Sequence, residues 1–546
     1  MLYLTIIWRA VDVQYISGAP GGLFLNRRSG ILMHISSLPG RAAIGTLGPE
    51  AEQFADFLCS AGFSLWQVLP LTPVSSVCGN SPYSSCSAFA GNRMLISGEL
   101  LVSEGLCDAD EFICRESCSK SDYQCAEADI DKLLASAWEK INTDAGSFID
   151  LKKEFHLFME EESFWLNDYT LFILLKEKFQ GRCWNEWSYE YRSRNAEALA
   201  CFASDGENAA RLNYLSFVQF IFYRQWRRLR AYCADRGISF IGDMPLYVAL
   251  DSADVWAHQA LFELDGEGAP QSVAGVPPDY FSKTGQRWGN PLYLWDEMEA
   301  DDFYWWRQRF YSAIKNYDIV RVDHFRGFCA YWAIPAEERT AVNGAWRGAP
   351  GAKLLNTLKR NLFAADGKMP LIAEDLGIIT DDVCRLMNEF SLPGMKVLMF
   401  AFGDDVGKNP YAPHNICRNS VVYTGTHDNN TVLGWWEKEA TARMRLRFKR
   451  YIGSDIFEHE AAERMVALAL ASAADIAVVA MQDIMGLDST ARMNVPGVPL
   501  GNWEWRAAKR DFASMTAAES ITVLKYRELN NIYGRLNKDC PRRENS

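Results

Sequence analysis

YDIVRVDHF (residues 317–325) is a short apolar run that ends in polar residues, which is typical of a buried parallel strand. Seven further runs of this kind occur along the chain, separated by longer stretches with helical apolar spacing. They are GILMHISS (30–37), SLWQVLPL (64–71), ISFIGDMPLYV (238–248), PLIAEDLG (370–377), MKVLMFAF (395–402), SVVYTGTHD (420–428) and DIAVVAMQDI (475–484). Eight strand–helix units are what a closed barrel requires, so we predict an α/β protein with a (β/α)8, or TIM, barrel.

The spacing of these runs predicts two large insertions. Ordinary βα loops have about 2 to 6 residues, but far longer stretches separate the second run from the third and the third from the fourth. We therefore expect a catalytic barrel over residues 26–546, interrupted by inserted subdomains at about 75–212 and about 250–297. The second insertion contains GVPPDYFSKTGQRWGNPLY (275–293), and a loop so rich in Gly, Pro and aromatics favours a binding lid over a passive connection.

Composition excludes several classes of protein. The chain has 546 residues with 56 basic and 69 acidic side chains, a net charge of −13, so we expect no nucleic-acid partner. No apolar run approaches the roughly 20 residues that span a bilayer, so no membrane segment is expected. Residues 1–25 lack a basic start and a small-residue cleavage site, and we interpret them as a mobile extension or as the result of a start codon placed too early. We expect a cytoplasmic protein.

Motifs for metals and cofactors are also missing from the sequence. It contains no GxGxxG or GxxxxGK loop and no HExxH pair, so we predict no cofactor and no metal. The 14 cysteines are scattered along a long chain, and we expect free thiols in a reducing compartment. Four of them lie close together in sequence but lack the pairwise spacing of a zinc site. These four are Cys107, Cys114, Cys118 and Cys125.

Carboxylates stand at the ends of four predicted strands. Catalytic groups of a (β/α)8 barrel come from the C-terminal ends of its strands, so these acids are expected to meet at one mouth. They are Asp243, Asp323, Glu374 with Asp375, and Asp428. One such acid is usually a helix cap, but several together are costly unless function needs them. Two carboxyl groups about 5 to 5.5 Å apart are the catalytic pair of a retaining glycosidase.

Strand alternation constrains two of these strand ends. Arg321 and Asp323 are two residues apart and point the same way, so we expect the cation to hold the carboxylate ionised. On the fifth strand only one of Glu374 and Asp375 can face inward, and alternation leaves open which one.

Several motifs occur in an order that resembles one enzyme family. They are HISSLPG (34–40), GNSPYSSCSAFAGN (79–92), FIGDMPLYV (240–248), GVPPDYFSKTGQRWGNPLY (275–293), RVDHFRG (321–327), IAEDLG (372–377), GTHDNNT (425–431), RMNVPG (492–497) and GNWEWR (501–506). From about residue 29 to about 510 the chain resembles the 4-alpha-glucanotransferases of the amylomaltase and disproportionating-enzyme family, glycoside hydrolase family 77. The cysteine-rich stretch 107–125 and residues 1–25 have no counterpart in this resemblance, and the position of Arg287 varies in it.

The resemblance implies roles for particular residues. Asp323 would be the nucleophile that forms a covalent glucosyl enzyme, Glu374 the general acid and then the base, and Asp428 the group that holds the 2- and 3-hydroxyls in the −1 subsite. Further contacts in that subsite would be Tyr83, Asp243, Arg321 and His427, with Asn494 as an additional substrate contact. Gln286, Trp288 and Asn290 would belong to a lid that folds over the glucan.

The implied reaction is a retaining double displacement. It would transfer a segment of an alpha-1,4-glucan or maltooligosaccharide donor to the 4-hydroxyl of glucose or a maltooligosaccharide acceptor, without a cofactor. The alternative is a retaining alpha-glucan hydrolase on the same barrel. We expect a monomer or a weak homo-oligomer.

Overall fold

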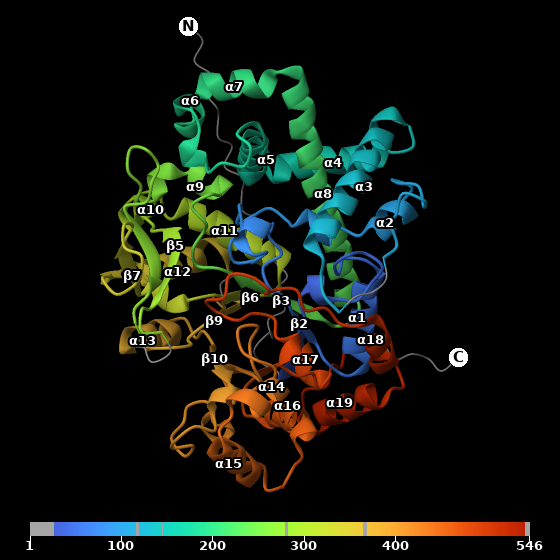
Figure 1. The fold of residues 1–546 in the computed structure, drawn as a ribbon, viewed down its shortest axis with the longest axis vertical. Coiled ribbons are helices and arrows are strands. Elements are labelled where there is room, and N and C mark those ends of the chain that lie inside the picture. Colours follow the sequence, from blue (N-terminus) through green and yellow to red (C-terminus); the bar gives the residue numbers. More distant parts are fainter. Residues whose placement is uncertain (1–26, 116–118, 145, 279–281, 364–367, 541–546) are drawn as a thin grey trace.

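Eight parallel strands close into a barrel, which confirms the predicted fold (Figure 1). The computed structural model describes residues 27–115, 119–144, 146–278, 282–363 and 368–540, so the extension predicted at 1–25 lies outside the described residues. The barrel strands are β1 (Arg28–Leu32), β2 (Leu65–Gln67), β3 (Ser239–Met244), β6 (Ile319–Val322), β9 (Leu371–Ala373), β10 (Gly394–Val397), β11 (Ser420–Tyr423) and β12 (Ile476–Ala480). Each lies within or overlaps one of the eight predicted runs, and β1 pairs with both β12 and β2 to close the barrel.

Helices surround the barrel and extend it. Those that follow the barrel strands or close the chain are α1 (Pro49–Ser60), α8 (Gly206–Ala234), α11 (Tyr304–Asn316), α12 (Gly351–Leu362), α13 (Asp381–Glu389), α14 (Val432–Gly434), α15 (Ala442–Ile452), α16 (Ala461–Ala471), α17 (Met481–Ile484), α18 (Lys509–Thr516) and α19 (Ile521–Ile532). The long helix α8 leads towards β3 and stops before Gly237, whose φ of 65° suits a residue without a Cβ.

The first insertion is helical and lies at the top of Figure 1. Its helices are α2 (Gly98–Ser103), α3 (Tyr123–Thr143), α4 (Ile149–Glu161), α5 (Ser163–Lys178), α6 (Tyr189–Arg192) and α7 (Ala196–Ser204). The aromatic residues Trp165, Tyr169 and Phe172 of α5 are buried, so they form core, as aromatic residues in a helix of this kind usually do.

The second insertion contributes to a separate four-stranded sheet. It contains α9 (Ala253–Ala257), β4 (Ser272–Val276), β5 (Gln286–Pro291) and α10 (Trp295–Ala300). Two further strands, β7 (Ala330–Pro335) and β8 (Ala345–Gly348), come from the connection between β6 and β9, and the sheet order is β5-β4-β7-β8. The sequence did not predict β7 and β8, because both strands are short and β8 is exposed along its whole length.

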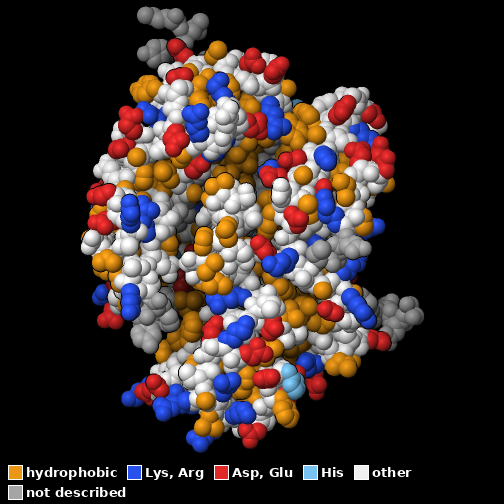
Figure 2. Space-filling model, in the orientation of Figure 1, with side chains coloured by type: hydrophobic (Ala, Val, Ile, Leu, Met, Phe, Trp, Pro, Cys, Tyr) orange, Lys and Arg blue, Asp and Glu red, His pale blue; other side chains and the backbone are white. Residues whose placement is uncertain are grey.

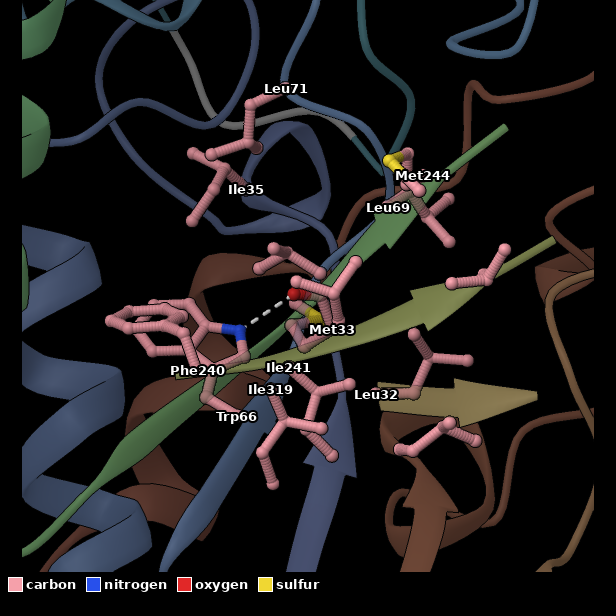
Figure 3. Close-up of a cluster of buried hydrophobic side chains, with 14 of the residues drawn as sticks. Leu32, Met33, Ile35, Trp66, Leu69, Leu71, Phe240, Ile241, Met244 and Ile319 are labelled. Atoms are coloured by element: carbon pink, nitrogen blue, oxygen red, sulfur yellow. Dashed lines mark hydrogen bonds between the residues drawn. The ribbon is translucent and has the colours of Figure 1, made fainter. Parts of the chain in front are cut away.

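Alternation along the barrel strands separates two apolar layers (Figure 3). Trp66 and Phe240 stand opposite each other in β2 and β3 and pack outwards against Phe54 of α1 and Trp226 of α8. The other face of these strands points into the barrel. Along β3 it carries Ile241 and then Asp243, and along β6 it carries Ile319 and then Arg321. The barrel interior is therefore apolar at its base and charged at its mouth.

One prediction about the cysteines is wrong. Cys59, at the end of α1, forms a disulfide with Cys540, with 5.4 Å between their Cα atoms. The other cysteines that the structure describes are free thiols, whereas Cys118 lies outside the described residues. The bridged pair is 481 residues apart in sequence, and only the fold brings it together: Asn537 donates a backbone hydrogen bond to the carbonyl of Gly62, just after α1.

Candidate active site

Arg321 is the centre of a charged cluster at the barrel mouth. It lies in β6, nearly buried, and its Nη1 donates to both carboxylate oxygens of Asp243 at 2.7 Å. Its Nη2 donates to Asp323 Oδ1 at 2.8 Å, as strand alternation predicted. The Asp243 side chain is fully buried, whereas that of Asp323 is 30% exposed, so Asp323 is the acid of this cluster that a ligand can reach. The hydroxyl of Tyr83 donates to Asp243 Oδ2 at 2.8 Å.

Glu374 follows β9 and occupies a different environment. Its Oε2 accepts a hydrogen bond from the backbone N–H of His324 at 2.8 Å, and its Oε1 accepts one from Leu376 at 2.7 Å. Burial raises the pKa of Glu374 to about 7, and the negative charge of Asp323 acts in the same direction. The two carboxyl groups thus have different surroundings: Asp323 accepts from a guanidinium, whereas among the described residues Glu374 accepts from backbone N–H groups.

The choice between Glu374 and Asp375 is decided by their hydrogen bonds. Asp375 accepts from the backbone N–H of Met395 at 2.6 Å and from Lys396 Nζ at 3.4 Å. It therefore points along the sheet towards β10, and Glu374 is the one that faces the mouth beside Asp323.

A second cluster surrounds Asp428 in the loop after β11. Asn494 Nδ2 donates to Asp428 Oδ1 at 2.6 Å, and His427 Nε2 lies 3.5 Å from Oδ2. The Tyr83 ring stacks on His427 with 5.0 Å between ring centroids, which joins this cluster to the one around Arg321. Arg492 holds the loop by donating to the backbone oxygen of Asp428 at 2.7 Å. The structure thus brings together residues from three segments that are distant in sequence.

The predicted lid is an ordered strand rather than a loop. Gln286, Trp288 and Asn290 lie on alternate positions of β5, which pairs with β4, and Trp288 Nε1 donates to Gln286 Oε1 at 3.1 Å. The Trp288 ring is 39% exposed and contacts His324 edge to face, with centroids 4.9 Å apart. Asn290 donates to the carbonyl of Val248 at 2.9 Å. The strand therefore places Trp288 over the residue that follows Asp323, while 279–281 of the same motif lie outside the described residues.

Two residues of this site were missed from the sequence. His324 has a left-handed backbone, with φ of 50°, and its N–H reaches Glu374. Such a φ is uncommon for a residue other than glycine and is a signal only once the backbone is known. Arg492 belongs to the RMNVPG motif, but nothing in that motif shows that it reaches the loop of Asp428.

The face drawn in Figure 2 is hollowed between the four-stranded sheet and the centre of the molecule, and apolar side chains line parts of the hollow. Within the described residues, no three His, Cys, Asp or Glu side chains are grouped so as to hold a metal ion. In the same part of the chain, no helix is both long and apolar enough to cross a membrane.

Comparison with known proteins identifies the family. A family model described as 4-alpha-glucanotransferase matches residues 33–511. The chain belongs to the 4-alpha-glucanotransferase family. A 4-alpha-glucanotransferase of Aquifex aeolicus is 45% identical over 489 residues, which cover 89% of this chain and 96% of that protein. The chloroplastic/amyloplastic 4-alpha-glucanotransferase of Solanum tuberosum is 41% identical over 515 residues, covering 93% of this chain and 87% of that protein.

Solved structures of amylomaltases agree with this family. The amylomaltase of Streptococcus agalactiae, solved in complex with acarbose, superposes with a TM-score of 0.87 at 37% identity, covering 93% of this chain and all of that one. The amylomaltase of Corynebacterium glutamicum has a TM-score of 0.66 at 16% identity, which shows a shared fold. The chain therefore shares its fold with both amylomaltases.

Proposed function

We propose that this member of the family transfers segments of alpha-1,4-glucans by a retaining double displacement through Asp323 and Glu374. The observation that carries the proposal is the contrast between these two carboxyl groups. Asp323 faces Arg321 at 2.8 Å, while burial raises the pKa of Glu374 to about 7. Neighbouring carboxyls whose environments differ in this way are suited to act as nucleophile and acid.

In the first half-reaction the Glu374 carboxylic acid gives its proton to the glycosidic oxygen. Asp323 Oδ attacks the anomeric carbon, the carbon–oxygen bond to the leaving glucan breaks, and a glycosyl ester forms on Asp323. In the second, the Glu374 carboxylate takes the proton of an acceptor 4-hydroxyl, whose oxygen attacks the same carbon and releases Asp323. Inversion occurs twice, so the alpha configuration is retained.

Asp428 is assigned a role without proton transfer. Its carboxylate is held by Asn494 at 2.6 Å, so its position is fixed before substrate binds. Hydrogen bonds from the 2- and 3-hydroxyls of the sugar to this carboxylate would strengthen as the ring approaches the oxocarbenium-like transition state. Tyr83, Asp243, Arg321 and His427 complete the wall of this subsite.

Transfer rather than hydrolysis requires that a bound acceptor outcompete water. A positioned hydroxyl can reach an effective molarity of about 10⁵ to 10⁸ M, far above that of water. Trp288 covers the residue next to Asp323 from β5, which reduces access of water on that side. The substrates are then alpha-1,4-glucan and maltooligosaccharide donors, with glucose or maltooligosaccharides as acceptors. The cytoplasmic location and the monomer or weak homo-oligomer expected from the sequence stay predictions.

Incubation with maltotriose alone tests the proposal. Products are separated by length while reducing ends are counted. Transfer predicts glucose together with a ladder of longer maltooligosaccharides at a constant number of reducing ends. Glucose and maltose with a rising number of reducing ends would instead establish the alternative, a retaining hydrolase on the same barrel.

A further inference from the structure

The loop that carries the nucleophile is contacted by both edge strands of the four-stranded sheet. In the order β5-β4-β7-β8, the edge strand β5 reaches this loop through Trp288, which contacts His324. The other edge strand, β8, reaches it through Trp346, whose ring lies under the guanidinium of Arg326, with 4.0 Å from Cζ to the ring centroid. His324 and Arg326 follow Asp323 by one and three residues, so the sheet holds this short loop at two points.

Arg326 also connects the nucleophile loop to the loop of the general acid. Its Nη1 donates to the carbonyl of Ile378 at 2.5 Å, and Ile378 lies four residues beyond Glu374. Its buried Nε finds no hydrogen-bond partner among the described residues. The guanidinium is therefore held on one side by a single carbonyl and on the other by the indole face, and loss of the ring would leave it poorly restrained.

Trp346 is itself held in place although it is exposed. It stands directly opposite Trp332 in the β7–β8 pairing, and the two rings meet edge to face with centroids 5.3 Å apart. Trp332 is fixed in turn by a hydrogen bond from its Nε1 to the carbonyl of Ala341 at 2.8 Å. Trp346 is 43% exposed, on a strand whose residues are all exposed, so hydrophobic burial alone does not account for a tryptophan here.

The backbone between Arg326 and the catalytic groups leaves little room for independent movement. A Cβ at Gly327 would lie 2.2 Å from Leu246 Cδ2, so the chain beside Arg326 is tightly packed. The N–H groups of His324 and Phe325 bond to Glu374, at its Oε2 (2.8 Å) and its backbone oxygen (3.2 Å). A displacement of Arg326 would therefore be transmitted to the N–H groups that hold Glu374.

We infer that Arg326 and Trp346 are positioning residues that hold the loops of Asp323 and Glu374 in register for the transfer reaction. Neither touches the reacting atoms. They act through the backbone N–H of His324 and the carbonyl of Ile378. This inference rests on the proposed function, because it concerns the geometry of the same two carboxyl groups.

The test compares four variants of the full-length protein with maltotriose as substrate. W346A removes the ring, W346F restores an aromatic face, and R326K keeps the charge but loses the planar guanidinium. R360K is the matched control, because Arg360 is an exposed arginine of α12 that bridges at 3.0 Å to Asp302, in the turn between α10 and α11. Since small misplacements of catalytic groups can cost about 100-fold, we expect W346A and R326K to lower kcat by about 10- to 100-fold with KM within about twofold. W346F should lie within about threefold of the wild type, and R360K should match it.

A second readout separates positioning from general loss of structure. Backbone N–H groups that bond to a carboxylate lower its pKa, so loosening the N–H of His324 should raise the pKa of Glu374 further. The alkaline limb of the pH profile of kcat/KM should then move to higher pH in W346A and R326K, at unchanged thermal unfolding temperature. If W346A does not fold, R326K and W346F test the positioning role instead, because both variants keep an aromatic ring at position 346. R326K should still lower kcat, whereas W346F should stay close to the wild type.

The possible results are distinct. If the wild type forms no maltooligosaccharide ladder, the proposed function fails irrespective of these variants. If the wild type is a transferase but W346A and R326K keep kcat within about twofold, the positioning role is wrong. A rise in KM at unchanged kcat would also overturn it, and would mean that Trp346 binds sugar.

Discussion

At the scale of one residue, burial changes the pKa of Glu374. Its ordinary pKa would leave it ionised at neutral pH, but burial beside Asp323 raises the pKa to about 7. In the proposed mechanism it donates a proton in the first half-reaction, which requires that it be protonated in the free enzyme. We expect kcat/KM for maltotriose to fall as pH rises through about 7, with a tenfold loss per pH unit above it. A pH profile measured on maltotriose checks this, and an alkaline limb already complete below pH 5 would contradict it.

Replacement of Glu374 by Gln separates the acid role from binding. The E374Q variant should lose most activity on maltotriose, whose leaving oxygen needs a proton, but should retain rapid glycosylation by a glycosyl fluoride, which needs little acid assistance. Single-turnover rates with both donors measure this difference. If E374Q slows the fluoride donor as much as maltotriose, Glu374 is not the acid.

Asp323 and Asp375 form a matched pair for testing the nucleophile. D323N removes the attacking oxygen, and we expect turnover to fall by at least about a thousandfold, while the fold is kept because Arg321 still pairs with Asp243. D375N changes a carboxylate that points to β10 and should cost less than about tenfold. Initial rates on maltotriose, with unfolding temperatures for both variants, check this. Full activity of D323N in a clean preparation would refute the assignment.

At the scale of elements, β5 places an indole beside the loop that carries Asp323. It holds Trp288 against His324, and the alternate residue Arg287 turns away and donates to the carbonyl of Ala336 at 3.0 Å. Loss of the indole should open the site to water without changing the strand. We therefore expect W288A to release more reducing ends per transfer event than the wild type.

The measurement for this prediction is the ratio of reducing ends released to maltooligosaccharides formed from maltotriose. R287A is the control on the same strand and should keep the wild-type ratio. An unchanged ratio in W288A would show that water is excluded by other elements.

At the scale of the whole molecule, a disulfide joins the last turn of α1 to Cys540, the last described residue. Cys59 lies shortly before β2, so the bridge to Cys540 lies at the N-terminal end of the barrel strands, opposite the candidate site. Cross-links that close long loops stabilise by about 2–4 kcal/mol, mainly by restricting the unfolded chain. For a chain of 546 residues this corresponds to a shift in unfolding temperature of about 2–4 °C.

We expect C540S to unfold at a temperature lower by that amount and to keep the wild-type kcat on maltotriose. A reductant should lower the unfolding temperature of the wild type to that of C540S. C417S, which changes an exposed free thiol, should unfold like the wild type. Equal unfolding temperatures for C540S and the wild type under oxidising conditions would show that the bridge contributes nothing.

Much of the barrel was predictable because each of its strands can be recognised from a short run of neighbouring residues. Each strand is a short apolar run, and period-two alternation places Arg321 and Asp323 on one side whatever the rest of the chain does. The four-stranded sheet was not predictable in the same way. Its strands come from two separate connections, and β8 carries no apolar alternation, since it is exposed along its whole length.

The sequence by itself determined the barrel, the strand ends that carry the acids and, through its motifs, the family. These properties depend on residue type and spacing along one segment at a time. Strand alternation left the choice between Glu374 and Asp375 open, the resemblance implied Glu374, and the hydrogen bonds of both residues agree with it. Only the tertiary structure decided that β5 and β8 both reach the nucleophile loop, and that Cys59 meets Cys540. Each of these depends on contacts between segments distant in sequence, whose relative positions are set by packing of the whole chain.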